Sequence, residues 1–417
     1  MFPSLRSKIA PYVAMAAAMA VLATGASAAD TIRVAHMDPL SGPFALVGES
    51  DSRLLQAAVD DINARGGVLG GTKLEIVNFD GKGSPQESVL ALKQIIDQGI
   101  RFVSLGSGSH IAHALLDTLS KHNSRNPDQA VLLLNIAAQD PPLTNEKCSF
   151  WHFRWEAHTD IRVKVLTDHI AAQKGTPKVY LLNQDYAFGQ AISRAAREML
   201  AARRPDIKIV GDDLHPLGKV KDYAPYISKI KASGADVVLT GNWGQDLTLL
   251  VKASKEAGLD VVFYTLNAHN PGVPGSLGKA GADRVRQVFT WHTNVADNKL
   301  EATANEYRKR FNEDMWLYLP KLQMDMLAKA IDNAKSADPL QVAKALHGMK
   351  FQGATGEVTM RASDHQLVSA QYIATFTKTG GAVKYDVEGT GLGWRTDVRV
   401  EGNDAILPTT CKMEIPK

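Results

Sequence analysis

Apolar and polar positions follow two alternating spacings along the first part of the chain. Thr31–Met37 is a short apolar run, whereas apolar residues in Val47–Ala64 recur three or four positions apart until the helix-stopping pair Gly66 and Gly67. The first spacing predicts a strand and the second predicts a helix. By the same criteria, further strands are predicted at Leu74–Phe79, Phe102–Leu105 and Val131–Ile136, and further helices at Pro85–Gln98 and His110–His122.

The alternation restarts near residue 158 and continues to residue 265. Helices are predicted at His158–Gln173, Phe188–Ala202, Tyr223–Ala232 and Asp246–Gly258, and strands at Lys178–Leu182, Ile207–Asp213, Asp236–Thr240 and Val261–Thr265. Strands that alternate with helices of this length form parallel sheets through right-handed β-α-β units. The pattern therefore predicts an α/β protein with two doubly wound parallel-sheet lobes.

The last third of the chain has a different pattern. Lys299–Met349 has mostly helical spacing, and Gly356–Met360 and Val368–Phe376 are expected to form a strand pair. Residues 381–417 show neither spacing clearly, so we expect an irregular tail there.

The N-terminus has the three parts of a secretory signal peptide. Arg6 and Lys8 form a basic start, Ile9–Thr24 is apolar, and small residues precede a cleavage point after Ala28 or Ala29. A membrane anchor is the alternative, but the apolar run is shorter than the ~20 residues that span a bilayer. No Cys lies near the cleavage point to carry a lipid. We therefore expect residues 1–29 to be removed and a soluble protein to be exported to the periplasm.

Charge and cysteine content narrow the functional classes. The 47 basic and 44 acidic residues are interspersed and give a net charge of +3, which is unlike the concentrated basic face of a nucleic-acid-binding protein. In an oxidising compartment, the pair Cys148 and Cys411 is expected to form a disulfide, although two unrelated thiols remain the alternative. Neither cysteine has ligands at metal-binding spacing, so no metal site is predicted.

Four motifs in this order resemble the leucine/isoleucine/valine-binding protein family, the type I periplasmic binding proteins of ABC importers. They are Asp38–Pro43, Asp61–Gly71, Asp185–Gly189 and Gly353–Gly356, and the resemblance covers roughly residues 30 to 378. A glycine pair after a helix is common by itself. The joint order and spacing of the four motifs carry the resemblance.

The resemblance implies two lobes joined by a three-stranded hinge. Lobe I would comprise residues 30–155 and 291–367, lobe II residues 156–290 and 368–380, followed by a C-terminal tail of residues 381–417. The chain would cross between lobes near Arg154–Thr159, Phe289–Thr293 and Gln366–Ser369. Such a protein is a monomer without a cofactor or catalytic activity, which captures a small solute between its lobes and delivers it to an ABC transporter membrane permease.

The loop after the strand Phe102–Leu105 is the first candidate ligand site. It ends in Ser109 and His110 at the start of a helix, where free N–H groups and the helix dipole favour an anion. In the family, the matching hydroxyl-bearing loop holds the solute carboxylate, but His110 departs from the pattern. His110 either donates to the carboxylate or merely begins the helix. A dinucleotide site is disfavoured because Ile111 stands where the third glycine of that motif belongs.

Two further groups of residues match positions that contact ligands in the family. Ala137, Ala138 and Gln139 match a loop that holds the amino-acid head, with Gln139 in place of the usual Ser or Thr. Phe188 and Trp243 match the aromatic side chains over the ligand. A Trp in a Gly-rich loop after a strand is otherwise hard to explain as part of the core.

The loop at 266–271 departs most from the amino-acid binders. Those proteins have an acid here for the ligand ammonium, whereas this loop offers His269 and no carboxylate. A buried ammonium without an acidic partner is costly. We therefore expect a carboxylate with an aromatic or apolar body. The alternatives are an amino acid bound by another acid, such as Asp185 or Asp246, and a periplasmic ligand sensor. An enzyme is disfavoured because the chain lacks a Gly-x-Ser-x-Gly nucleophile motif.

Overall fold

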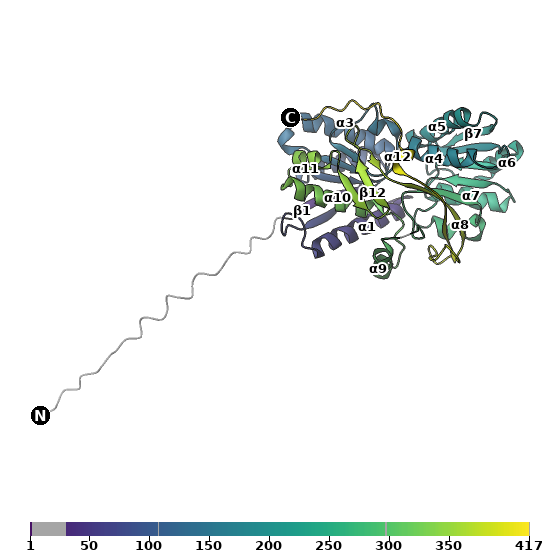
Figure 1. The fold of residues 1–417 in the computed structure, drawn as a ribbon. Helices are drawn as coiled ribbons and strands as arrows, with labels where there is room; N and C mark the ends of the chain where they lie inside the picture. The colour runs from purple at the N-terminus through teal and green to yellow at the C-terminus, as the bar shows by residue number, and fades with distance from the viewer. Residues whose placement is uncertain (2–30, 107, 297, 417) are drawn as a thin grey trace.

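The computed structural model describes Met1 and residues 31–106, 108–296 and 298–416, and the chain forms two α/β lobes side by side (Figure 1). The predicted signal peptide, apart from Met1, and Ser107 of the first candidate loop lie outside the described residues. Within the described part of the chain, no helix is long and apolar enough to cross a membrane.

Lobe I is built on a parallel five-stranded sheet in the order β2-β1-β3-β4-β5. Its strands are β1 (Ile32–Asp38), β2 (Leu74–Asp80), β3 (Phe102–Leu105), β4 (Leu132–Asn135) and β5 (His152–Arg154). Helices α1 (Ala45–Ala64), α2 (Pro85–Asp97), α3 (Ser109–Arg125), α10 (Leu319–Ala334) and α11 (Pro339–Leu346) accompany this sheet, with the 3-10 turns η1 (Pro127–Gln129) and η2 (Pro141–Thr144). β3 and β4 are buried along their whole length, as expected for parallel strands covered on both faces.

Lobe II is built on a seven-stranded sheet in the order β15-β14-β10-β9-β8-β6-β7. β6 (Val179–Gln184), β7 (Ile209–His215), β8 (Val237–Thr240), β9 (Val262–Thr265) and β10 (Val285–Phe289) are parallel, whereas β14 (Gln371–Lys378) and β15 (Leu392–Val400) add antiparallel. The helices of this lobe are α4 (Thr159–Ala171), α5 (Ala187–Arg203), α6 (Ala224–Ser233), α7 (Gln245–Glu256), α8 (Val273–Gly281) and the short α12 (Gly402–Ala405).

The chain passes between the two sheets three times before β15. It leaves lobe I after β5, leaves lobe II after β10, and re-enters lobe II between β13 and β14. The segment after β10 contains α9 (Glu301–Phe311), α10 and α11, followed by a small antiparallel sheet of β11 (Lys350–Gly353), β12 (Gly356–Met360) and β13 (Leu367–Val368). The first and third crossings are bonded directly, because Arg154 N donates to His365 O at 2.9 Å.

The C-terminal third differs from the prediction in two ways. Gly356–Met360 and Val368–Phe376 were expected to pair, but only Val368 does so, opposite Thr359 as part of β13. The rest of the second segment belongs to β14 in the other sheet, because the chain changes lobe after β13. Residues 381–417 were expected to be irregular, yet they contain β15, which pairs with β14 from Leu392 to Val400. Only the first three residues of β15 are buried, and from Arg395 onward exposed charged residues alternate with half-buried ones, so its apolar signal is weak.

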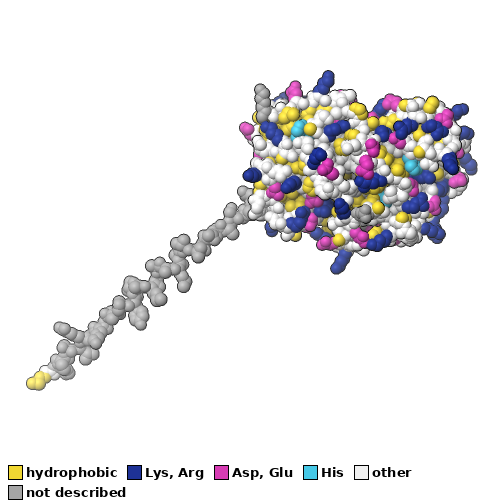
Figure 2. All heavy atoms as spheres, in the orientation of Figure 1, with side chains coloured by type: hydrophobic (Ala, Val, Ile, Leu, Met, Phe, Trp, Pro, Cys, Tyr) yellow, Lys and Arg dark blue, Asp and Glu magenta, His cyan; other side chains and the backbone are white. Residues whose placement is uncertain are grey.

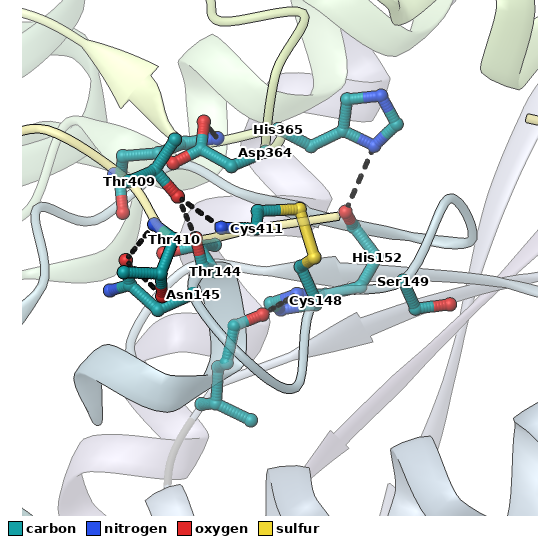
Figure 3. Close-up of a disulfide and its surroundings, with 12 residues drawn as sticks. Thr144, Asn145, Cys148, Ser149, His152, Asp364, His365, Thr409, Thr410 and Cys411 are labelled. Carbon is teal, nitrogen blue, oxygen red and sulfur yellow. Dashed lines mark hydrogen bonds between the residues drawn. A yellow bond between two sulfur atoms is a disulfide. The ribbon is translucent and has the colours of Figure 1, made fainter. Parts of the chain in front are cut away.

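A disulfide joins Cys148 of lobe I to Cys411 in the C-terminal segment, with their Cα atoms 5.7 Å apart (Figure 3). Beside it, Thr409 Oγ1 donates to Thr144 O at 2.9 Å and Thr410 N donates to Asn145 Oδ1 at 3.0 Å. Because β15 belongs to lobe II, the segment that follows it returns to lobe I and makes a fourth connection between the lobes. Figure 1 shows this yellow segment running over to the C-terminus, beside lobe I.

We expect the double variant Cys148→Ser/Cys411→Ser to unfold more easily than the wild type. The disulfide closes a loop of 263 residues in sequence, and loss of a native disulfide typically costs about 2–5 kcal/mol of unfolding free energy. Calorimetric melting of the oxidised wild type, the reduced wild type and the variant measures the effect. Reduced wild type should match the variant. Equal melting of all three would show that the noncovalent contacts of the tail suffice.

Candidate functional site

A cavity between the lobes lies where strands of both sheets end. Most of its lining residues lie in the loops that follow the carboxyl ends of β3, β4, β6, β8 and β9. Open α/β sheets bind ligands at this end of their strands. About 560 Å³ lies between the lining atoms, including space open to solvent. The lining residues are Val47, Gly106, Gly108, Ser109, Ile136, Ala137, Gln139, Glu156, Tyr186, Phe188, Trp243, Asn267, His269, Asn270, Trp316 and Leu317.

The lobe I end of the cavity offers hydrogen-bond donors at a helix N-terminus. Ser109 is the first residue of α3, and Gly108 before it has a φ of 78°, a conformation that glycine adopts without strain. Ser109 Oγ accepts from Gln139 N at 3.3 Å, which leaves the hydroxyl hydrogen to donate to a ligand. The α3 dipole adds positive potential at this end. These groups suit a carboxylate.

Aromatic side chains form the opposite wall and also bridge the lobes. Trp243 of lobe II stacks on Phe44 of lobe I with ring centroids 3.9 Å apart. Trp243 Nε1 donates to the Tyr186 hydroxyl at 3.0 Å, which fixes the indole orientation. Trp316 contributes a further ring and donates from Nε1 to Ser50 Oγ at 3.0 Å. This wall favours a flat or apolar ligand body.

His269 is uncharged at neutral pH and separates two compartments. Burial lowers its pKa well below the ordinary value, and the positive charge of Arg162 lowers it further. Its ring packs on Trp316 and Phe289 at centroid distances of 5.1 and 5.2 Å. Its Nδ1 has no hydrogen-bond partner within the described part of the chain. A smaller cavity, lined also by Trp394, continues beyond His269 and Trp316.

Glu156 places a carboxyl group in the cavity that the sequence analysis did not identify. It lies in the first crossing, just after β5, and is 5% exposed. Its Oε1 accepts from Ala157 N at 2.8 Å, and its Oε2 lies 3.7 Å from Arg162 Nη1. Burial raises the pKa of Glu156, while Arg162 and the Ala157 N–H oppose that rise. The three-residue strand β5 was not predicted, so the position of Glu156 was not evident.

The predicted site residues divide into two groups. Six of them line the cavity, namely Ser109, Ala137, Gln139, Phe188, Trp243 and His269. His110 does not line it, because its Nε2 lies 3.4 Å from Gly83 O and its ring packs edge-on against Tyr186, behind the cavity wall. Ala138 is also outside the lining, since its N–H and C=O both bond the buried side chain of Asn135.

Neither alternative acid reaches the cavity. Asp185 Oδ1 accepts from Gln190, and Asp246 Oδ2 accepts from Gln184 Nε2 and Gly218 N. The loop after β9 provides only neutral groups, as the sequence suggested. Asn267 Nδ2 donates to Gly241 O at 3.0 Å, and Asn270 Oδ1 has no partner among the residues that the structure describes.

Three comparisons with known proteins identify the family and the fold. The family model described as periplasmic binding protein matches residues 31–382. The chain is 29% identical to Leu/Ile/Val-binding protein homolog 4 of Brucella abortus, over 99% of this chain and 100% of that protein. It is 27% identical to the leucine-, isoleucine-, valine-, threonine- and alanine-binding protein of Brucella ovis, solved in a closed conformation. That comparison has a TM-score of 0.82 and covers 93% of this chain and 100% of that one.

A solute-binding protein of an ABC transporter from R. palustris, solved with 4-hydroxybenzoate, shares the fold at 20% identity. Its TM-score is 0.77, with 89% of this chain and 97% of that chain covered. The resemblance inferred from the four sequence motifs is thus confirmed. The chain belongs to the periplasmic binding protein family.

Proposed function

We propose that this protein is the periplasmic solute-binding component of an ABC importer and captures a small carboxylate with an aromatic or apolar body. The observation that carries the proposal is the two-sided cavity. Donors at the start of α3 face it from lobe I, and Trp243 with Phe188 faces it from lobe II. Export by the predicted signal peptide and the absence of catalytic function are parts of the same proposal.

The neutral lining favours this solute class over an amino acid. Within the described lining, no Lys or Arg is present and the single acid, Glu156, lies beside Arg162. A zwitterion would need a separate negative partner for its ammonium, whereas a simple carboxylate needs only the donors near Ser109. The solved relative with 4-hydroxybenzoate supports an aromatic acid. The names of the Brucella relatives keep a branched-chain amino acid as the second candidate.

Closure of the lobes would trap the solute. The stack of Phe44 on Trp243 joins lobe I to lobe II across the cavity and can form only when the lobes are close. A ligand that contacts both lobes stabilises that state by its differential affinity. The closed form would then dock on a permease. On the face of the molecule shown in Figure 2, basic and acidic side chains are interspersed.

We expect aromatic carboxylates to raise the melting temperature of the mature protein, residues 30–417, more than leucine does. A ligand at about 100 times its dissociation constant adds about 2.7 kcal/mol of stability, which shifts the melt by a few degrees. A thermal-shift panel would contain benzoate, 4-hydroxybenzoate, phenylacetate, leucine and valine. Benzyl alcohol is the control without a carboxylate and should give no shift. A shift with leucine alone would contradict the proposed solute class.

Replacement of Trp243 by Ala should weaken binding of the best carboxylate about 10- to 100-fold. The change removes the aromatic wall and the inter-lobe stack, and burial of an aromatic side chain is worth about 1.5–3 kcal/mol. Titration calorimetry gives the dissociation constants. Trp151→Ala is the matched control, because Trp151 is partly buried in lobe I and is not part of the cavity lining. Equal affinity of both variants and the wild type would place the solute elsewhere.

A further inference from the structure

Glu156 is the one acid among the described residues that line the cavity, and its position differs from that of an ordinary surface carboxylate. It is 5% exposed and lies in the first crossing between the lobes, in the loop between β5 of lobe I and α4 of lobe II. Oε1 is occupied by Ala157 N at 2.8 Å. Oε2 has Arg162 Nη1 at 3.7 Å, which is beyond hydrogen-bond distance. Glu156 therefore retains capacity to accept a hydrogen bond from a bound solute.

Arg162 determines what kind of donor suits Glu156. Its Nη2 donates to Leu266 O at 2.6 Å and to Val288 O at 2.8 Å, so the guanidinium is anchored at the ends of β9 and β10. Its Nε and Nη1 have no hydrogen-bond partners in the described ranges, which leaves Glu156 as the adjacent counter-ion. A ligand ammonium at Oε2 would lie close to this buried positive charge. A neutral O–H donor avoids that repulsion.

We propose that Glu156 accepts a hydrogen bond from a hydroxyl group of the bound carboxylate, and that the solutes of this protein are hydroxylated aromatic acids. The inference rests on the proposed function, because the carboxylate is placed at Ser109 and the ring against Trp243. Arg162 lies beside Glu156 and favours its charged form, and the hydroxyl of the solute completes the polar contacts at that end. A solute without a hydroxyl leaves a buried carboxylate incompletely bonded, which costs affinity.

The test compares benzoate with its three monohydroxy isomers and with leucine by titration calorimetry of the mature protein. We expect at least one hydroxybenzoate to bind the wild type about tenfold or more tightly than benzoate. In Glu156→Gln and in Glu156→Asp, the ratio of the benzoate to the hydroxybenzoate dissociation constant should fall to about threefold or less. Glu156→Asp keeps a carboxylate near Arg162 but shortens the side chain. It therefore tests the same preference if Glu156→Gln does not fold.

Asp185→Asn is the matched control, because Asp185 is an exposed acid of lobe II outside the cavity lining. It should retain the wild-type preference. If the wild type binds benzoate and the hydroxybenzoates equally, or if both Glu156 variants keep the preference, the inference is wrong while the proposed function stands. If leucine binds and no benzoate does, both are wrong, and loss of leucine binding in Glu156→Gln would identify Glu156 as an ammonium acceptor.

Discussion

The buried guanidinium of Arg154 holds together the parts of the chain on which the cavity depends. Arg154 Nε donates to Gln366 Oε1 at 2.8 Å, and its Nη1 donates to Asp140 O at 2.7 Å. The first bond joins the first crossing to the third, and the second fixes the loop that carries Gln139. Burial lowers the pKa of Arg154 to about 9, while Asp364 and Asp140 favour its charged form. The guanidinium therefore stays charged at neutral pH and holds the first and third crossings side by side.

The arrangement around the cavity follows from the cost of charge inside a closed protein. The described lining has no Lys or Arg, His269 is held neutral by burial, and the one acid lies beside the buried Arg162. Under the proposed function, recognition of the solute carboxylate would fall to dipoles and hydroxyl donors, which need no counter-charge. The aromatic rings provide contact area, and the indole N–H groups of Trp243 and Trp316 already have protein partners in Tyr186 and Ser50.

The C-terminal segment adds a constraint that the three crossings do not supply. β15 extends the lobe II sheet, and the chain then returns to lobe I, where Cys411 is bonded to Cys148. Arg361 Nη1 donates to Leu407 O at 2.7 Å along the way. The lobes are therefore joined by a fourth connection, which ends in a covalent bond to lobe I.

Local pattern in the sequence determined the α/β class and the alternating elements, because parallel strands and amphipathic helices each impose a spacing on neighbouring residues. Loops at the carboxyl ends of those strands could likewise be named, and Ser109, Gln139 and Trp243 line the cavity. Only the tertiary structure brought in Glu156, Phe44 and Trp316. Glu156 lies in the loop after β5, and Phe44 and Trp316 lie just before helices, where no periodicity marks a site. Their positions are set by how the two lobes meet, which is a long-range contact that local spacing does not encode. The pairing of β15 with β14 joins consecutive strands, and it was missed for a different reason: from Arg395 to Val400 exposed charged residues alternate with half-buried ones, so the apolar signal of β15 is weak.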